Sequence, residues 1–177
     1  GEKETGVTTF KLKHEIDTGD ILLQEKFAIG ENETAGEVHD KMKETGAQLL
    51  VTTVKGLADG SVKEVPQLTR EMLRHAPKIY TDTCRIDWNK PVEEIHNLIR
   101  GLSPYPGAFT SFHDKTLKIY SSKKELKAPG ISPGQFETDK KSFLRFAAAD
   151  GYIYVLEIQP EGKKRMAIED FLRGYRG

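Results

Sequence analysis

The stretch TAGEVHDKMKETGAQLLVTTVKGLADG, residues 34–60, gives the clearest signal for the fold of this 177-residue chain. Thr34 and Glu37 have the spacing of a capping box, in which two side chains satisfy free backbone N–H groups where a helix begins. Apolar residues then recur at helical spacing, namely Val38, Met42, Leu49, Leu50, Val54 and Leu57. The pattern predicts one long amphipathic helix over residues 35–59, which ends before Gly60.

Two strands are predicted before this helix. Residues 7–13 alternate apolar and polar side chains, and residues 21–29 follow a turn at residues 17–20. The two strands can pair as a hairpin, but they form too small a sheet to cover a helix of this length. Residues 1–61 are therefore predicted to be the C-terminal part of a larger α/β domain.

Behind the helix the pattern changes twice. Residues 62–82 contain prolines and mixed charges without periodicity, which indicates a linker with one short helical turn around residues 69–74. Residues 83–177 are predicted to form a second domain. Its elements are a strand at 85–88, a helix at 91–102, strands at 108–113, 116–121, 134–137, 142–148 and 152–159, and a helix at 167–173. Many short strands joined by turns predict a small, mostly antiparallel β-barrel.

The charges balance overall but are unevenly distributed. The 27 Lys and Arg residues equal the 27 Asp and Glu residues, which excludes a uniformly basic nucleic-acid coat and an acidic disordered tail. Residues 1–61 hold 7 basic against 12 acidic residues, net −5, whereas residues 83–177 hold 16 against 12, net +4. The basic excess indicates a local surface for a polyanion, and chance imbalance on a solvated surface explains it equally well.

Composition also limits the setting of the protein. No apolar run approaches the roughly 20 residues that span a bilayer, so no membrane partner is expected. Cys84 is the single cysteine and cannot form an intramolecular disulfide, which favours a reducing cytoplasm. His39, His75, His96 and His113 share no metal-ligand spacing, so no metal is expected.

A turn between the two predicted strands carries two carboxylates, in the sequence Ile16-Asp17-Thr18-Gly19-Asp20. Loops at strand ends often build functional sites, and a carboxylate held there could orient a catalytic imidazole or shuttle a proton. Asp and Gly are also ordinary turn residues. A plain structural turn is therefore the competing interpretation.

The turn also belongs to a wider resemblance. Residues 1–8, GEKETGVT, followed by residues 16–22, IDTGDIL, resemble the second half of a folate-dependent formyltransferase domain. Residues 86–88, 99–108 and 159–166 resemble the methionyl-tRNA formyltransferase family. These segments cover almost the whole chain in the family's order. The resemblance implies that residues 1–61 are an α/β remnant of a Rossmann-like catalytic domain and that residues 83–177 form an OB-like β-barrel.

The resemblance implies transfer of the formyl group of 10-formyltetrahydrofolate to the methionyl amine of initiator Met-tRNA, without a metal. The family's active site joins an Asn, a His and an Asp; Asp17 matches the Asp and is the predicted catalytic residue. Ile16, Thr18, Gly19 and Asp20 form the predicted folate-side loop. The family's Asn and His precede the point where this chain begins. We therefore expect a C-terminal fragment that is inactive alone, from a monomeric parent; the fragment's own oligomeric state stays open.

The resemblance also implies that the linker and barrel hold the tRNA. The predicted tRNA-binding residues are Lys163, Lys164 and Arg165, which are consecutive cations after a strand end, together with Lys78 and Arg100. Further support comes from lysines in turns and at strand ends, namely Lys115, Lys118, Lys123, Lys124, Lys127, Lys140 and Lys141. Solvated surface charge is the competing interpretation for each of them.

Aromatic residues of the second domain are expected to pack rather than to stack on bases; they are Trp88, Tyr105, Phe109, Phe112, Phe143 and Phe146. Residues 103–107, SPYPG, are expected to form an elbow or an ordinary loop. Two further functions stay open. One is a formyltransferase that acts on a nucleotide-sugar amine, and the other is an RNA-binding module without chemistry.

Overall fold

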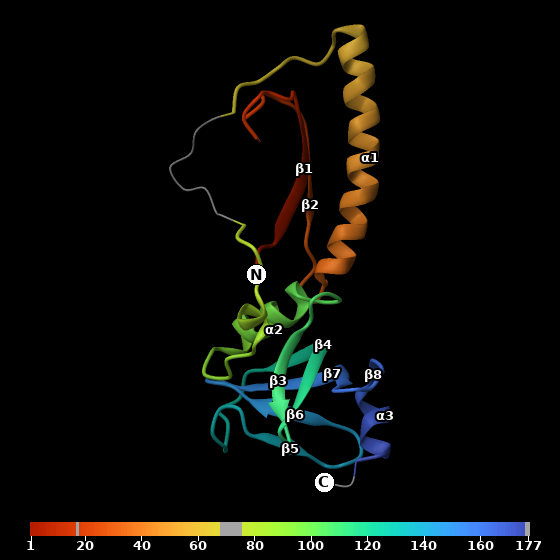
Figure 1. Cartoon of the computed structure of the whole chain (residues 1–177). Helices are drawn as coiled ribbons and strands as arrows, with labels where there is room; N and C mark the ends of the chain where they lie inside the picture. Colours follow the sequence, from red (N-terminus) through yellow and green to blue (C-terminus); the bar gives the residue numbers. More distant parts are fainter. Residues whose placement is uncertain (17, 68–75, 176–177) are drawn as a thin grey trace. The chain divides into compact units, whose positions relative to one another are not determined.

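The structure is a computed structural model that describes residues 1–16, 18–67 and 76–175 (Figure 1). The chain forms two compact units. Unit 1 comprises Gly1, Thr34–Gly36 and Lys78–Gly177, and unit 2 comprises Glu2–Glu33 and Glu37–Pro77. Asp17 and the helical turn predicted around residues 69–74 lie outside the described residues. The domain boundaries predicted after residues 61 and 82 stay predictions.

Unit 2 begins with an antiparallel hairpin of β1 (Glu4–Phe10) and β2 (Ile21–Ala28), in a register that runs from Glu4 opposite Ala28 to Phe10 opposite Ile21. The predicted second strand and the pairing are confirmed. The first strand was predicted too late in the chain, at residues 7–13. Its apolar alternation continued to Leu12, but Leu12 is 85% exposed because the chain leaves the ladder after Phe10.

The helix of unit 2 is α1 (Ala35–Asp59), as predicted. Its buried residues are Leu49, Thr53 and Gly56, and the Thr53 hydroxyl lies 2.8 Å from that of Thr9 on β1. Gly56 lies against the segment that follows the helix, because a Cβ atom there would be 2.3 Å from Val62 Cγ2. Figure 1 shows α1 running alongside β1 and β2. Leu50, Val54 and Leu57 are about half exposed, at 57, 58 and 49%, which agrees with the expectation that two strands cannot cover a helix of this length.

Unit 1 contains a curled sheet of six strands in the order β3-β4-β7-β6-β5, with β8 paired to β7. All its pairings are antiparallel. The strands are β3 (Ala108–Phe112), β4 (Lys115–Glu125), β5 (Phe136–Thr138), β6 (Leu144–Ala147), β7 (Tyr152–Pro160) and β8 (Met166–Ala167). The helices are the 3-10 helix η1 (Thr81–Cys84), α2 (Val92–Gly101) and α3 (Ile168–Arg173).

Most elements of unit 1 match the prediction to within a few residues, whereas η1 and β8 were not predicted. The strand predicted at residues 85–88 was wrong. Only Arg85 forms a bridge, in parallel with Phe109. The chain turns immediately afterwards, because the Asp87 carboxylate accepts the backbone N–H of Asn89 at 3.0 Å.

The core of unit 1 lies between α2 and one face of the sheet. Ala108, Ile119 and Ile158 are opposite one another on β3, β4 and β7, and each is fully buried. Trp88 stacks on Phe146 with ring centroids 4.6 Å apart, and the buried Cys84 belongs to the same cluster. No pairing joins β3 to β5 among the described strands, so closure into an OB-like barrel stays a prediction.

Candidate functional site

The turn that carries the predicted folate-side loop is held by backbone contacts. A Cβ atom at Gly19 would lie 1.6 Å from the carbonyl oxygen of Lys11, so only glycine fits at this position. The Gln67 side chain donates to the Gly19 carbonyl at 2.6 Å, and the Lys11 N–H donates to the Asp20 carbonyl at 3.0 Å. Packing therefore explains the glycine of this turn without any ligand.

The other residues of the predicted loop differ in accessibility. Ile16 is 90% exposed, and the Thr18 hydroxyl donates to the Glu15 carbonyl at 3.0 Å. The Asp20 carboxylate forms an ion pair with Lys13 at 3.0 Å. The second carboxylate of the turn is therefore ion-paired, whereas Asp17 lies outside the described residues and its role stays a prediction.

The basic loop Gly162–Arg165 contains two exposed lysines and one ion-paired arginine. Lys163 and Lys164 are exposed, and the described residues place no acid within ion-pair distance of either. Arg165 instead forms a two-point ion pair with Glu157, with both N···O distances 2.5 Å, and its guanidinium lies 4.4 Å from the Tyr120 ring centroid. The hydrogen bond to Glu157 holds the pKa of Arg165 above its ordinary value. Two of the three predicted contacts thus keep unneutralised charge.

The two isolated cations of the prediction lie in different places. Lys78 lies over the Tyr80 ring, with its Nζ atom 5.6 Å from the centroid. Arg100 lies in the last turn of α2, where its Nε donates to the Asn97 side chain at 2.8 Å. A tRNA role for each of them stays a prediction.

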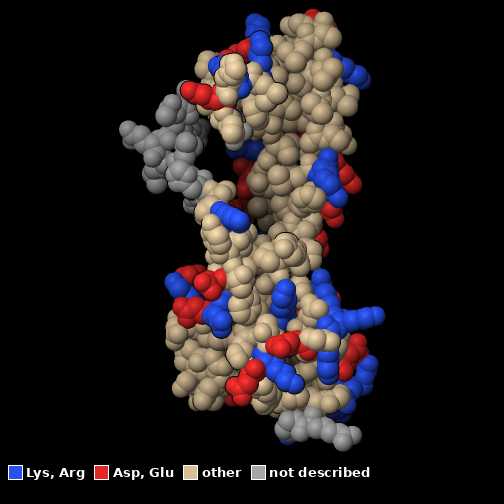
Figure 2. Space-filling model, viewed as in Figure 1, with Lys and Arg blue, Asp and Glu red and all other residues tan. Residues whose placement is uncertain are grey.

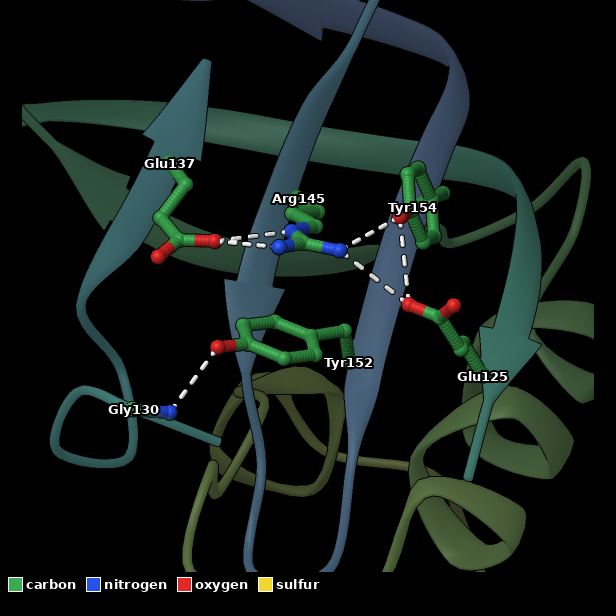
Figure 3. Close-up of polar contacts among 6 residues, drawn as sticks. All are labelled: Glu125, Gly130, Glu137, Arg145, Tyr152 and Tyr154. Carbon is green, nitrogen blue, oxygen red and sulfur yellow. Dashed lines mark hydrogen bonds and ion pairs between the residues drawn. The ribbon is translucent and has the colours of Figure 1, made fainter. Parts of the chain in front are cut away.

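A cation inside the sheet is neutralised by its neighbours. Arg145 on β6 donates to Glu137 at 2.6 and 2.8 Å and to Glu125 at 3.1 Å (Figure 3). Its guanidinium also lies 3.9 Å from the Tyr152 ring centroid and donates to the Tyr154 hydroxyl at 2.5 Å. Two carboxylates surround one guanidinium, so this cluster ties β4, β5, β6 and β7 together and offers no free cation to a ligand.

The face of β3 and β4 opposite the buried residues carries a row of side chains that the sequence did not bring together, although Lys118 was among the supporting lysines and Phe109 among the aromatics expected to pack. Arg85 is opposite Phe109, Phe109 is opposite Lys118, and Lys118 is opposite Gln159. Side chains that face each other in register lie on the same side of a sheet. The row borders a cavity of about 680 Å³ in unit 1, whose lining includes Arg85, Phe109, Lys118 and Tyr105.

The signal for this row was present but weak. Along β3 the buried residues Ala108, Thr110 and Phe112 alternate with Phe109 and Ser111, so the period of two placed Phe109 on the other face, where it is half buried and also packs against the core cluster. Arg85 and Lys118 come from other segments, and only strand pairing brings them beside Phe109. Tyr105, expected to pack, is 85% exposed.

The visible surface of unit 1 mixes both charge signs, and Lys and Arg side chains gather along the edge where Figure 1 places β7 and β8 (Figure 2). The basic loop leaves this edge between β7 and β8. The basic surface is therefore local rather than uniform. Among the described residues, the structure contains no helix of the length and apolar character needed to cross a membrane.

The architecture of a hairpin with a long helix in one unit and a curled antiparallel sheet in the other occurs in solved structures of other proteins. HypX from Aquifex aeolicus in complex with tetrahydrofolic acid is 19% identical, with a TM-score of 0.71 over 98% of this chain and 31% of that chain. An N-formyltransferase from Helicobacter canadensis is 23% identical, with a TM-score of 0.67 over 90% of this chain and 56% of that chain. At these identities the likeness defines the fold.

The family itself follows from the sequence models. Residues 78–176 match the model described as formyl transferase, C-terminal domain, and residues 1–54 match the model described as formyl transferase. The chain belongs to the formyl transferase family. The two matched ranges correspond to the two parts of the chain, residues 1–61 and 83–177, in which the resemblance to formyltransferases lies.

Curated relatives narrow the comparison. The methionyl-tRNA formyltransferase of Phocaeicola vulgatus is 48% identical over 185 residues, which cover 99% of this chain and 57% of the relative. The methionyl-tRNA formyltransferase of Porphyromonas gingivalis is 45% identical over 189 residues, with the same two shares. The chain thus spans a little over half the length of these relatives.

Proposed function

We propose that this chain takes part in transfer of the formyl group of 10-formyltetrahydrofolate to the methionyl amine of initiator Met-tRNA, in the cytoplasm. The observation that carries the proposal is the 48% identity over 99% of the chain to the Phocaeicola vulgatus methionyl-tRNA formyltransferase. The likeness to sugar-modifying and HypX structures at 19–23% identity concerns the fold and does not favour their substrates.

The two units have separate parts in this proposal. Unit 2 would contribute the hairpin and helix of a Rossmann-like formyltransferase domain, and unit 1 would be an OB-like module that holds the tRNA. The curled antiparallel sheet of unit 1 and the long helix beside the hairpin of unit 2 support this division.

Asp17 would serve the chemistry at the hairpin turn. Formyl transfer needs attack of the amine on the formyl carbon, donors for the oxyanion that forms, and a route for the amine proton. A carboxylate supplies the last requirement by orienting an imidazole or a proton-carrying water. The close packing of Gly19 against Lys11 supports a fixed turn for the residues Ile16, Thr18 and Asp20 around it.

Lys163 and Lys164 would contact the phosphate backbone of the tRNA. They are exposed cations without a neighbouring acid, and each cation that neutralises a phosphate releases a counterion on binding. The double variant Lys163→Ala, Lys164→Ala should weaken binding of labelled initiator tRNA to the chain and flatten the log–log salt slope by about 1.5–2.

The matched control removes the same charge from unit 2, to which the proposal assigns no tRNA contact. Lys3 and Lys55 are exposed there. The variant Lys3→Ala, Lys55→Ala should leave the salt slope closer to that of the unmodified chain. Equal slopes for both double variants would contradict phosphate contact by the basic loop.

The catalytic part needs a separate experiment. We would fuse to Gly1 the part of the Phocaeicola vulgatus enzyme that this chain does not match. This chimera would then be assayed for formylation of initiator Met-tRNA. The chimera should be active, the same chimera with Asp17→Ala should be inactive, and the 177-residue chain alone should be inactive. An active Asp17→Ala chimera would refute the role of Asp17. Formylation of a nucleotide-sugar amine without tRNA binding would refute the choice of substrate.

A further inference from the structure

The cavity of about 680 Å³ in unit 1 has a volume within the range of about 300–1,000 Å³ usual for ligand pockets. Its floor is the outward face of β3 and β4, where Phe109 is opposite Lys118. The guanidinium of Arg85 lies 5.1 Å from the Phe109 ring centroid. An aromatic ring is thus flanked by two cations on adjacent backbone segments.

Aromatic side chains also form the walls of this pocket. Tyr105 is 85% exposed and Tyr80 is 64% exposed, and both line the cavity. Neither ring belongs to the core cluster of unit 1. The exposed ring faces provide flat surfaces on which a planar ligand can stack.

The conformation of the loop that carries Tyr105 depends on Gly107, two residues later. Gly107 has a φ of 87°, and a Cβ atom there would lie 3.1 Å from the Tyr120 ring and 3.4 Å from Lys118 Cδ. Lys118 donates one of its three ammonium hydrogens to the Pro106 carbonyl at 2.9 Å. These contacts fix the loop against β4 and leave further Lys118 donors for a ligand.

The charged side chains that line the pocket are both cationic. Arg85 and Lys118 are its cations, and no Asp or Glu is among the described residues that line it. The part of the chain that the structure describes places no carboxylate within ion-pair distance of either cation. A partner that fits therefore combines a planar ring with negative charge.

We propose that this pocket holds an unpaired nucleotide of the bound RNA, with its base against Tyr105 and Phe109 and its phosphate beside Arg85 and Lys118. Single-stranded RNA is commonly bound in this way, because every base has a face that stacks on aromatic rings while cations follow the backbone. The inference rests on the proposed function, in which unit 1 holds tRNA, and adds the kind of nucleotide that it recognises.

The basic loop lies beside the pocket and continues the same surface. The Gln159 side chain, opposite Lys118, donates to the Lys163 carbonyl at 2.9 Å. Thr116, which lines the pocket, exchanges hydrogen bonds with Glu161 at 2.8 and 2.9 Å. One RNA strand can therefore place a base in the pocket and a neighbouring phosphate at Lys163 or Lys164.

The test compares a short single-stranded RNA of mixed sequence with the same strand in a blunt duplex, by fluorescence anisotropy on the 177-residue chain. The chain should bind the single strand more tightly. Tyr105→Ala should weaken single-strand binding about 5- to 150-fold and leave duplex binding unchanged. Tyr105→Phe, the matched control, keeps the ring and should bind like the unmodified chain.

A 2-aminopurine in the strand reports the stacked base directly. Its fluorescence should be quenched on binding to the unmodified chain and to Tyr105→Phe, but not on binding to Tyr105→Ala. Arg85→Gln should weaken single-strand binding and flatten its salt slope, whereas Lys55→Gln on α1, outside the pocket, should change affinity less.

Two negative results have different meanings. If Tyr105→Ala and Arg85→Gln bind the single strand like the unmodified chain while the Lys163, Lys164 double variant loses tRNA affinity, the pocket proposal fails and the proposed function stands. If the chain binds neither RNA nor tRNA, both fail.

Discussion

The two units of the chain differ in how they bury apolar surface. In unit 1, α2 and one face of the sheet pack together into one cluster, in which Ile119, Phe146 and Ile153 are fully buried. In the described part of unit 2, Leu49 is the single buried apolar side chain. Almost all buried apolar side chains of the described residues therefore lie in unit 1.

The difference follows from what each helix faces. α2 turns Val92, Ile95 and Ile99 toward a sheet that is wide enough to cover them. α1 is much longer but lies against only two strands, so many of its apolar residues remain about half exposed. Full burial of one such side chain contributes about 1.5–3 kcal/mol, and unit 2 gains little of it.

The largest effect that would test this contrast is a core truncation. Ile153→Ala should lower the free energy of unfolding of unit 1 by about 2–5 kcal/mol, because Ile153 is fully buried and the site cannot collapse completely. Leu57→Ala in unit 2 should cost less, about 0.7–1.5 kcal/mol, because Leu57 is 49% exposed and only about half of its side chain leaves water on folding. Urea unfolding followed by the fluorescence of Trp88, the single tryptophan, measures unit 1.

Comparable losses from the two substitutions would mean that Leu57 is buried in solution. The helical signal at 222 nm provides the second readout, because α1 is the longest helix of the described chain. Different urea midpoints for Trp88 fluorescence and for this signal would confirm that the two units unfold separately.

An intermediate effect is expected at the hairpin turn of unit 2. Gly19→Ala should destabilise the unit by about 1–3 kcal/mol, because the new Cβ would overlap the Lys11 carbonyl and the backbone must move. Gly46→Ala is the matched control, because its Cβ would meet Val7 Cγ1 at an ordinary 3.9 Å. Alanine in the helix should then be neutral or stabilising by up to about 1 kcal/mol.

Thermal unfolding at 222 nm measures both glycine variants. Equal melting temperatures for Gly19→Ala and Gly46→Ala would show that the turn is not packed against Lys11. The result matters for the proposed function, because the turn carries the predicted catalytic Asp17 and a loosened turn would move it.

The smallest effect concerns an exposed loop of unit 1. The Asp139 carboxylate accepts hydrogen bonds from the Ser142 hydroxyl and from the backbone N–H groups of Ser142 and Lys141, which hold its pKa well below the usual 3.8. A lowered pKa in the folded state stabilises the fold above the usual value. This contribution is lost as the pH falls below 3.8 toward the folded pKa.

Ser142→Ala removes the first of these donors and should raise the pKa of Asp139 toward 3.8, measured by NMR titration of the carboxyl group. The variant should also lose less stability than the unmodified chain between about pH 5 and about pH 3. A pKa for Asp139 that is unchanged by Ser142→Ala would contradict the assignment of the shift to this hydrogen bond.

Local patterns predicted most elements of both units. The capping box and the stop at Asp59-Gly60 placed α1, and alternation with turn residues placed β3 and β7. The first strand was predicted to end too late, and a strand was wrongly predicted at residues 85–88. In both segments the apolar alternation continues beyond the residues that pair with another strand. The role of Asp17 was predicted from a resemblance and stays a prediction, as do the tRNA contacts at Lys78, Arg100 and residues 163–165.

The sequence by itself determined the family, the long helix and the turns, because these depend on residues close together in the chain. Tertiary structure alone decided which cations are free and which are paired. Arg165 lies against Glu157 and Tyr120, while its neighbours Lys163 and Lys164 remain in solvent. Strand register also assembled the pocket at Arg85, Phe109 and Lys118, since residues far apart in sequence become neighbours only when strands pair.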